Sequence, residues 1–424
     1  MTEQIKNRIA EIKQGKVPDG YIRNSLGVTP EAWEEKTLND IGCFYKGKGI
    51  PGNELQDDGL PCIGYGDIYM KYNYHFEKAL NFVNQKTADE SQPIQKGTLL
   101  FTGSGETAEE IGKCVCYNGD EIIYAGGDII LYNTDVNPLL ISYQQSIEPS
   151  IKAKTKLAQG HSVVHIYADR LGKLSVVYPQ DKQEQKKITD VLMKWDEAIA
   201  LQEKLIEKLE VQKKALMQRL LTPKEDWANF LMASLGETYG GLVNKSKDDF
   251  GEGKPYVTYM NIFSNSILDV NSFEYVRINA EEKQNKVKYG DILFTTSSET
   301  PEELGATSVL LSEIDELYLN SFCFGFKLFN FYTLTPEFAA YFFRSLYFRT
   351  ILKSLAQGAT RFNLSKSSLM KVDIFLPDIE IQKKIAAILT KADNIIAFQQ
   401  QKLNNLKLQQ KSLMQLLLTG IVRV

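Results

Sequence analysis

Two stretches of the chain carry the same heptad pattern of apolar residues. From residue 185 to residue 222, apolar side chains recur at alternating steps of four and three, and the pattern returns about 197 residues later. The two seams are Ile188, Leu192, Trp195, Ile199, Gln202, Ile206, Leu209, Lys213, Leu216 and Leu220, and Ile385, Leu389, Ala392, Ile396, Gln399, Leu403, Leu406, Gln410, Leu413 and Leu417. We therefore expect two helices of about 38 residues, each roughly 57 Å long.

Each seam has two polar positions, and these predict how the helices pair. Gln202 corresponds to Gln399 and Lys213 to Gln410. A polar seam residue is tolerated best opposite another polar residue, so these positions set the register. An antiparallel pair would place Gln202 opposite Gln410 and Lys213 opposite Gln399, and a parallel pair would match the polar positions as well. We favour the antiparallel pair, because a domain of similar size precedes each helix and a two-fold axis would place the two domains at opposite ends of a spacer.

The segments before the helices are rich in predicted strands. Alternating apolar residues and Gly, Pro and Asp punctuation indicate short strands and loops, and residues 138–159 are expected to add one or two helices. The predicted fold is α+β, with two strand-rich mixed domains separated by a pair of long antiparallel coiled-coil helices and an internal pseudo-two-fold repeat. The expected parts are an N-terminal helical segment (1–30), a first domain (31–178), a central long helix (179–222), a second domain (223–376) and a C-terminal long helix (377–424).

Short motifs recur at matching places in the two domains, while the residues between them differ. The matching pairs are Tyr45-x-Gly47 with Tyr239-x-Gly241, Leu100–Thr102 with Leu293–Thr295, Glu106–Gly112 with Glu299–Gly305, and Leu157–Gly160 with Leu355–Gly358. Thr29-Pro30 before Trp33 likewise matches Thr222-Pro223 before Trp227. This pattern is typical of two readers that share one scaffold and recognise different targets.

Composition and charge narrow the function classes. The net charge of −4 and the pI of about 5.7 argue against a broadly basic nucleic-acid-binding protein, so any such surface must be local. The five cysteines have no zinc-binding spacing, and the chain has only three histidines. No apolar run approaches a membrane span, and the N-terminus is polar. We expect a soluble, cytoplasmic protein without a metal site.

Apparent catalytic motifs do not hold up. Gly103-Ser104-Gly105 resembles the start of a phosphate-binding loop, but the second copy has Thr296-Ser297-Ser298 and no lysine follows. The acidic run from Pro377 to Lys383 resembles a nuclease motif, but its counterpart lacks the pattern, so a helix start explains it better. We therefore predict no catalytic residue in this chain.

Recognition of a two-part ligand remains, and DNA is such a ligand because its half-sites repeat with the helical turn. Loops with Lys, Arg, Ser, Thr, Asn and Tyr can reach phosphates and base edges. The candidate DNA-binding residues are Lys46, Lys48, Tyr65, Thr102, Gly103, Ser104 and Ser162 in the first domain, and Lys245, Lys247, Tyr259, Thr295, Thr296, Ser297, Ser298, Thr360, Arg361 and Asn363 in the second. Arg361 and Asn363 are the strongest candidates, since Arg suits guanine and Asn suits adenine.

The whole chain resembles the specificity subunit of a Type I restriction–modification enzyme. The resemblance rests on the duplicated layout, the Thr-Pro…Trp openings, the Leu-Phe-Thr strands, the Gln-Gly segments and the two helices that begin Gln-Lys-Lys-Ile and end Leu-Leu-Thr. It implies that each domain is a target recognition domain for one half of a split site on double-stranded DNA, and that the helices set the gap.

The resemblance also implies partners. Two modification (methyltransferase) subunits would dock on the chain and methylate adenine with S-adenosylmethionine, which they and not this chain would bind. Restriction (translocase–nuclease) subunits would complete the enzyme. Two alternatives remain: a non-enzymatic coiled-coil adaptor whose domains bind other proteins, and a self-contained enzyme.

Overall fold

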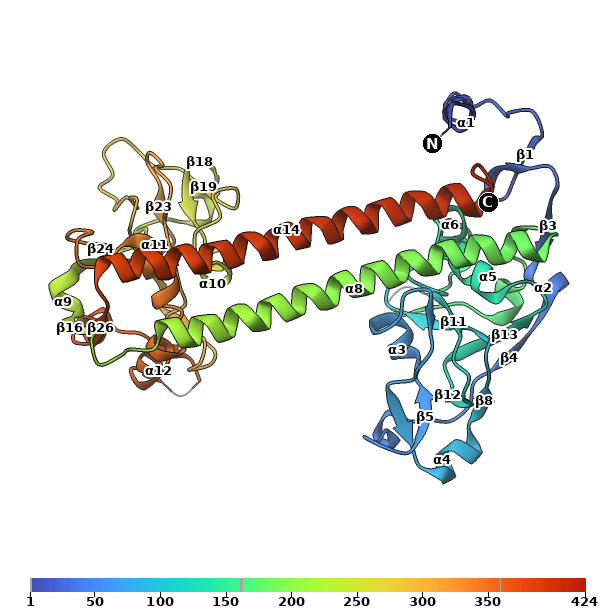
Figure 1. Ribbon diagram of the computed structural model, residues 1–424, viewed down its shortest axis with the longest axis horizontal. Coiled ribbons are helices and arrows are strands. Elements are labelled where there is room, and N and C mark those ends of the chain that lie inside the picture. Colours follow the sequence, from blue (N-terminus) through green and yellow to red (C-terminus); the bar gives the residue numbers. More distant parts are fainter. Residues whose placement is uncertain (1, 161–162, 359) are drawn as a thin grey trace. The chain divides into compact units, whose positions relative to one another are not determined.

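The computed structural model describes residues 2–160, 163–358 and 360–424 and divides the chain into two compact units. The first unit combines residues 1–201 with 402–424, and the second consists of residues 202–401. Both unit boundaries fall inside long helices, α8 (Lys182–Leu221) and α14 (Ile379–Leu418), of 40 residues each (Figure 1). Within the described residues, no helix is both long enough and apolar enough to span a membrane.

The first unit is built mainly on two mixed sheets. A five-stranded sheet has the order β4-β13-β9-β11-β6, and a four-stranded sheet has the order β7-β5-β12-β8. Its strands are β1 (Tyr21–Asn24), β2 (Gly27–Pro30), β3 (Trp33–Thr37), β4 (Gly42–Lys46), β5 (Leu60–Ile63), β6 (His75–Phe76), β7 (Asn81–Val83), β8 (Gln92–Ile94), β9 (Leu99–Thr102), β10 (Ser104–Gly105), β11 (Cys114–Tyr117), β12 (Ile123–Ala125), β13 (Ile129–Thr134), β14 (Val164–His165) and β15 (Ser175–Pro179). Its shorter helices are α1 (Glu3–Lys13), α2 (Leu38–Ile41), η1 (Gly52–Glu54), α3 (Tyr65–Met70), α4 (Gln85–Glu90), α5 (Pro138–Gln144), α6 (Glu148–Leu157) and α7 (Ala168–Leu171).

The second unit repeats this plan in shorter form. Its main sheet has the order β17-β24-β20-β22, and a three-stranded sheet has the order β19-β18-β23. Its strands are β16 (Ala228–Leu231), β17 (Gly236–Gly240), β18 (Phe250–Val257), β19 (Glu274–Val276), β20 (Ile292–Thr295), β21 (Ser297–Ser298), β22 (Thr307–Val309), β23 (Tyr318–Leu319), β24 (Cys323–Leu328), β25 (Phe362–Asn363) and β26 (Asp373–Leu376). Its shorter helices are α9 (Met232–Leu235), η2 (Lys247–Asp249), α10 (Tyr259–Ser264), α11 (Pro336–Phe342), α12 (Leu346–Ser354) and α13 (Lys366–Leu369).

The recurring sequence motifs lie at equivalent places in the two main sheets. The Leu-Phe-Thr motifs form β9 and β20, every residue of which is buried between its neighbouring strands. Gly47 and Gly241 follow β4 and β17, where an added Cβ would lie 1.9 Å and 2.0 Å from the carbonyl oxygens of Gly126 and Asn320. These motifs are therefore requirements of the scaffold, as the duplication indicates.

A buried glutamine fixes the start of each long helix to its domain. Gln185 Nε2 donates to the Pro179 carbonyl at 2.7 Å, and Gln185 Oε1 accepts from the backbone N–H of Asn137 at 3.0 Å. Gln382 makes the matching bonds in the second unit, to the Pro377 carbonyl at 2.8 Å and from the Thr335 N–H at 3.0 Å. The repeated Gln-Lys-Lys-Ile opening therefore begins with a residue that satisfies backbone groups where the strand ends and the helix begins.

The long helices pair in antiparallel fashion, as predicted, but the predicted facing pairs are wrong. In the second unit, Gln202 Nε2 donates to Gln399 Oε1 at 2.8 Å, and Lys213 forms an ion pair with Asp393. In the first unit, Gln410 Nε2 donates to Asp196 Oδ1 at 2.5 Å. Gln202 therefore contacts Gln399 instead of Gln410.

The physical reason for this difference is that Lys213 and Gln410 find their partners in aspartates outside the seam, whereas Gln202 and Gln399 contact one another. Asp196 and Asp393 each lie one position beyond the seam, and each also accepts a hydrogen bond from a domain tyrosine, Tyr143 or Tyr341. Each residue of α8 has a counterpart 197 positions later in α14. The counterparts of Asp196 and Gln410 are therefore Asp393 and Lys213, and these two residues also contact each other. The predicted pseudo-two-fold repeat is thus present in the pairing itself.

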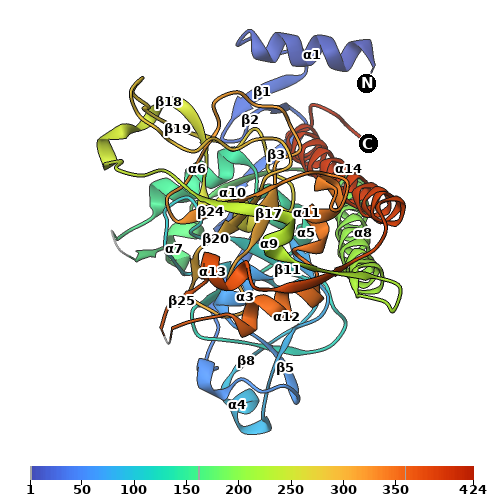
Figure 2. The ribbon, with the colours of Figure 1, turned by 90° about the vertical axis from the view of Figure 1, so that its left-hand side faces the viewer.

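The two ends of the chain meet in the first unit (Figure 2). The Tyr21 hydroxyl donates to the Gly420 carbonyl at 2.9 Å. The guanidinium of Arg423 binds the carboxylate of Glu184 with both arms, Nε to Oε1 at 2.8 Å and Nη2 to Oε2 at 2.6 Å. The C-terminal tail is therefore tied to the start of α8 and to the β1–β2 hairpin, an element that the sequence analysis did not predict.

A buried lysine in the first unit binds the end of the recurring motif Glu106–Gly112. Lys154 of α6 donates from Nζ to the carbonyls of Gly112 at 2.8 Å and Gln145 at 2.9 Å. Burial lowers the pKa of Lys154 to about 8, because a charged ammonium is disfavoured away from water. In the second unit, Arg349 Nη1 donates to the carbonyl of Gly305 at 3.0 Å.

Candidate nucleic-acid interface

Three chain segments meet at one end of the main sheet in the first unit, and we call this place the three-segment junction. It consists of the bend 103–105 after β9, the turn 126–128 before β13, and residues 163–167 around β14. Gly103 is its centre: its N–H donates to the Asp128 carbonyl at 3.1 Å, and its carbonyl accepts from the Ile166 N–H at 3.0 Å. Ser104 pairs with His165 in the short β10–β14 ladder.

The second unit has the same junction, made of residues 296–298, 320–322 and 361–365. The Thr296 N–H donates to the Phe322 carbonyl at 3.0 Å, and the Thr296 carbonyl accepts from the Leu364 N–H at 2.8 Å. Ser297 pairs with Asn363 in the β21–β25 ladder. Equivalent backbone groups are thus bonded in both units, although the side chains differ.

The recurring Gln-Gly pair holds the third segment of each junction. Gln159 and His165 exchange two backbone hydrogen bonds, as do Gln357 and Asn363. Gly160 and Gly358 have φ values of +113° and +124°, and an added Cβ would lie 2.1 Å and 2.2 Å from a carbonyl oxygen three residues later. Glycine is required here because both the backbone conformation and the close approach exclude a side chain.

A tyrosine hydroxyl donates to the bend in each unit, and in the first unit this is not the tyrosine that the sequence predicted. Tyr259 OH donates to the Ser297 carbonyl at 2.9 Å. Its counterpart by sequence, Tyr65, is 46% exposed, and Tyr69 makes the equivalent bond, to the Ser104 carbonyl at 2.9 Å. Tyr69 lies one helical turn further along α3, a spacing that would have suggested it as a substitute. The Tyr259 hydroxyl therefore has a structural role, because it binds the backbone of the bend.

The side chains that the two junctions expose differ in chemistry at equivalent positions. Backbone pairing matches Asp128 with Phe322, Val163 with Arg361, His165 with Asn363, and Tyr167 with Ser365. Phe322 is 61% exposed, and Val163 and Tyr167 are each 52% exposed. The first junction thus has a carboxylate, an aliphatic group, an imidazole and a phenol where the second has a phenyl ring, a guanidinium, an amide and a hydroxyl.

Several predicted DNA contacts are excluded by burial. Thr102 and Thr295 end the central strands and are fully buried, so neither can reach a ligand, and their selection as contacts was wrong. Ser297 and Ser298 are each only 6% exposed. The Ser297 hydroxyl accepts from Arg361 Nε at 3.2 Å, so this serine positions the arginine.

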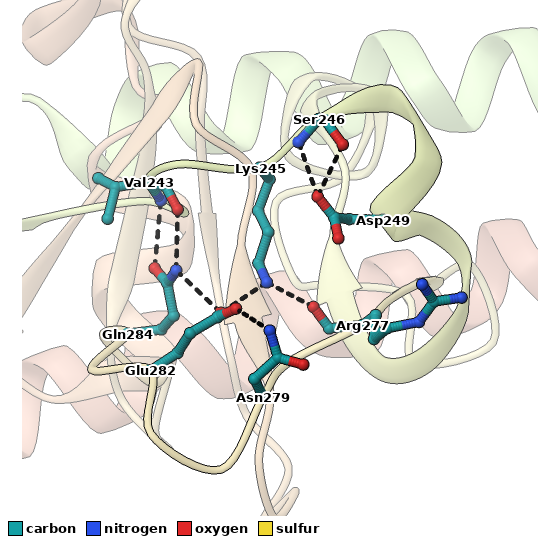
Figure 3. A network of polar contacts seen from close by, with 8 residues as sticks. All are labelled: Val243, Lys245, Ser246, Asp249, Arg277, Asn279, Glu282 and Gln284. Atoms are coloured by element: carbon teal, nitrogen blue, oxygen red, sulfur yellow. Dashed lines mark hydrogen bonds and ion pairs between the residues drawn. The ribbon is translucent and has the colours of Figure 1, made fainter.

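Lys245 has a structural role that the sequence did not indicate (Figure 3). Its side chain is 4% exposed, and its ammonium lies 2.5 Å from the Glu282 carboxylate and donates to the Arg277 carbonyl at 2.6 Å. Lys245 holds the pKa of Glu282 below its usual range. Gln284 binds both backbone groups of Val243, at 3.1 Å and 2.9 Å. This network fixes the loop before β18, and Lys245 is therefore removed from the candidate contacts.

The remaining candidates are accessible to differing degrees. Exposed side chains belong to Lys46, Lys48, Lys247, Thr360, Arg361 and Asn363, while Gly103, Ser104 and Thr296 are half-buried. Ser162 lies outside the described residues. Lys46 and Lys48 lie beside the first junction: Lys46 pairs with Ile130, and the Lys48 N–H donates to the Ala125 carbonyl at 3.1 Å. Lys247 instead begins η2, the short helix directly after Lys245 and Ser246.

Five further residues belong to the junctions but are not among the candidates predicted from the sequence: Asp128, Phe322, Val163, His165 and Tyr167. Aligning the two Leu-Ala-Gln-Gly motifs would have paired Val163 with Arg361 and His165 with Asn363, so that signal was available. Asp128 and Phe322 could be matched only through the backbone bonds described above. Among the residues that the structure describes, no group of three His, Cys, Asp or Glu side chains is arranged to hold a metal ion.

Comparison with known proteins identifies a domain that occurs twice. The family model described as the Type I restriction modification DNA specificity domain matches residues 30–211 and 224–408. The Type I restriction enzyme MjaVIII specificity subunit of Methanocaldococcus jannaschii is 26% identical over 418 residues, which cover 93% of this chain and 94% of that protein. The putative type I restriction enzyme MjaX specificity subunit of the same organism is 24% identical over 448 residues, covering 96% and 97%.

Solved structures show the same fold. The S subunit of a Type I restriction–modification system from M. genitalium matches with a TM-score of 0.53 and 15% identity over 91% of this chain and 96% of that one. A chain from a structure of a type I restriction–modification complex matches with a TM-score of 0.61 and 13% identity, covering 93% and 99%. Because the two family matches together span most of the sequence, this chain belongs to the family of Type I restriction–modification DNA specificity domain proteins.

Proposed function

We propose that this chain is the DNA specificity subunit of a Type I restriction–modification complex and reads a two-part site. Residues 31–178 would read one half-site and residues 223–376 the other. The observation that carries the proposal is the pair of three-segment junctions, which share their backbone hydrogen bonds and expose different side chains. A fixed frame with variable side chains suits two readers of different sequences, since base edges are distinguished by donors, acceptors and methyl groups.

The long helices would act as the spacer between the half-sites and as the seat of the partner subunits. Exposed apolar residues recur at counterpart positions of the two helices: Leu201 (60% exposed) matches Phe398 (63%), and Val211 (63%) matches Leu408 (64%). A surface that occurs twice in one chain suits a partner that binds twice, and two modification subunits are such a partner. Exposed apolar side chains at matching places support docking there.

In this proposal the chain performs no chemistry itself. The modification subunits would bind S-adenosylmethionine and methylate adenine in both half-sites, and restriction subunits would add translocation and cleavage. Lys46 and Lys48 beside the first junction and Arg361 in the second are exposed cations that can meet phosphates, and partner subunits would supply further phosphate contacts. An adaptor that binds only other proteins would not need readers that differ at every exposed junction position.

Methylome sequencing of cells that express the chain with its modification subunits tests the proposal. The expected methylated motif has two specified parts separated by a gap of fixed length. Replacing residues 31–178 with the corresponding domain of a relative should change one part and leave the other part and the gap unchanged. A continuous motif, a change in both parts, or no methylation that depends on this chain would refute the proposal.

A further inference from the structure

Asp128 and Phe322 occupy the same position of the two junctions, immediately before the equivalent strands β13 and β24. Each carbonyl accepts the N–H at the centre of its junction, Gly103 at 3.1 Å and Thr296 at 3.0 Å. Both side chains are exposed. The backbone therefore presents one residue at the same point of each domain, and that residue is a carboxylate in one and a benzyl group in the other.

Phe322 is held exposed by a well-bonded turn. Asn320 Oδ1 accepts the Phe322 N–H at 2.8 Å, and the Asn320 carbonyl accepts the Cys323 N–H at 3.1 Å. The side chain is 61% exposed, although a phenylalanine normally gains stability from burial. Asn363 lies on the adjoining β21–β25 ladder, and Arg361 directly precedes that ladder. Because the turn fixes the Phe322 backbone beside these polar side chains, the phenyl ring is a preformed apolar contact for a ligand.

Asp128 restricts the ligand chemistry in the first unit. A carboxylate at a DNA surface is repelled by phosphates, so it is favourable there only where it meets a hydrogen-bond donor. The major groove offers amino donors on cytosine and on adenine, and the usual partner of an acidic side chain is the cytosine amino group. An apolar side chain instead suits the methyl group of thymine. The two residues therefore match different pyrimidine edges.

We propose that this position is a specificity-determining contact to a base: Asp128 selects cytosine in the first half-site, and Phe322 selects thymine in the second. The inference rests on the proposed function, because it requires that each domain reads one half-site. It assigns one base pair of each half-site to one residue, while the shared backbone of the junction leaves the rest of the reader unchanged.

The complex of the full chain with its modification subunits provides the test. Methylation rates are measured on duplexes randomised at one half-site at a time, for the wild type, Asp128→Ala and Phe322→Ala. A good base contact discriminates by about 10- to 100-fold. Each alanine variant should reduce that preference to less than about threefold at one base pair of its own half-site and leave the other half-site unchanged. Phe322→Leu, which stays apolar, should keep the thymine preference.

The chain supplies matched controls at the far ends of the same two strands. Asp135 follows β13 and is exposed, and Phe329 follows β24 and is 60% exposed. Asp135→Ala and Phe329→Ala should leave both base preferences intact. The inference is overturned if the Asp128 and Phe322 variants keep every preference, lose rate equally on all sequences, or behave like the controls. If the wild-type complex shows no two-part preference at all, the proposed function fails instead. If Phe322→Ala does not assemble, loss of the thymine preference in an assembled Phe322→Leu complex also overturns the inference.

Discussion

Asp393→Ala is the most direct test of how the two long helices pair. The Asp393 carboxylate forms an ion pair with Lys213 of α8 and accepts from Tyr341 OH of α11 at 2.9 Å. Tyr341 is fully buried, and burial together with the neighbouring carboxylate raises the pKa of its phenol, so its hydroxyl stays protonated and needs an acceptor. In the register predicted from the seams alone, Lys213 would face Gln399, so Asp393 would keep its bond to Tyr341 but lose its ion pair with Lys213. The two registers therefore predict different costs for Asp393→Ala.

Asp393→Ala removes one hydrogen bond to a charged acceptor and one ion pair. A hydrogen bond to a charged acceptor contributes about 1.5–3 kcal/mol. Thr390 Oγ1 lies 3.1 Å from the Tyr341 hydroxyl and remains as a partner, which places the loss at the lower end. The side chains of Lys213 and Asp393 are 22% and 32% exposed, so breaking their ion pair adds about 1 kcal/mol. Asp393→Ala should therefore destabilise the helix pairing in the second unit by about 2–3 kcal/mol.

Hydrogen exchange of the peptides that cover residues 206–221 and 385–401 measures this loss directly. A loss of 2–3 kcal/mol corresponds to an increase of roughly 30- to 150-fold in exchange from locally opened states. Lys213→Gln is the matched control, because it copies Gln410, which donates to Asp196 at 2.5 Å in the first unit. That variant should cost less than about 1 kcal/mol. Exchange within twofold of the wild type in Asp393→Ala, or an equal effect of Lys213→Gln, would refute the register.

Two further predictions concern the scaffold. Lys154 has its pKa lowered to about 8 from an ordinary value near 10.5, so the unfolded chain binds more protons between those pH values and stability should rise with pH there. Between pH 7 and pH 10.5, the free energy of unfolding of the wild type should rise by up to roughly 3 kcal/mol relative to that of Lys154→Met, as measured by denaturant unfolding. If the difference between the two proteins does not change with pH, the burial of a charged lysine is contradicted. Gly358→Ala should destabilise its junction by at least about 1–3 kcal/mol, because of its positive φ and a Cβ 2.2 Å from the Arg361 carbonyl oxygen. Gly358→Ala should abolish recognition of the second half-site, and Gly160→Ala should abolish recognition of the first. Methylation of duplexes that carry the split site measures both effects. If either variant loses recognition of both half-sites, the two domains do not read independently.

The helices were predictable because a heptad pattern reports directly on burial, and the duplication made the antiparallel pair plausible. The register was not predictable by matching polar seam positions with one another. Gln410 and Lys213 find their partners in Asp196 and Asp393, which lie outside the seam and are also bound by tyrosines of the domains. No pattern within the helices alone indicates that a domain residue shares the carboxylate.

The motifs that form the candidate interface could be identified from the sequence, but the accessibility of their side chains could not. The Gln-Gly motifs and the ends of the Leu-Phe-Thr strands do meet at one junction in each unit. The sequence cannot show that Thr102, the polar last residue of its strand, is fully buried. In a strand that is covered on both faces, apolar and polar residues do not alternate, so the pattern does not indicate which residues are exposed. The sequence also cannot show that the Lys245 ammonium is paired with the Glu282 carboxylate. Glu282 lies 37 positions later in the chain, and the β18–β19 hairpin between them brings the two side chains together.

The internal duplication separates what the scaffold requires from what the readers vary. Gly160 and Gly358 are identical because any side chain would strike the backbone, and Gln185 and Gln382 are identical because each satisfies the same backbone groups. Residues free of such constraints, such as Asp128 and Phe322, differ although their backbone bonds are the same. Because specificity can change at these positions without moving the backbone, an exchange of exposed side chains between the two junctions should alter recognition at little cost in stability.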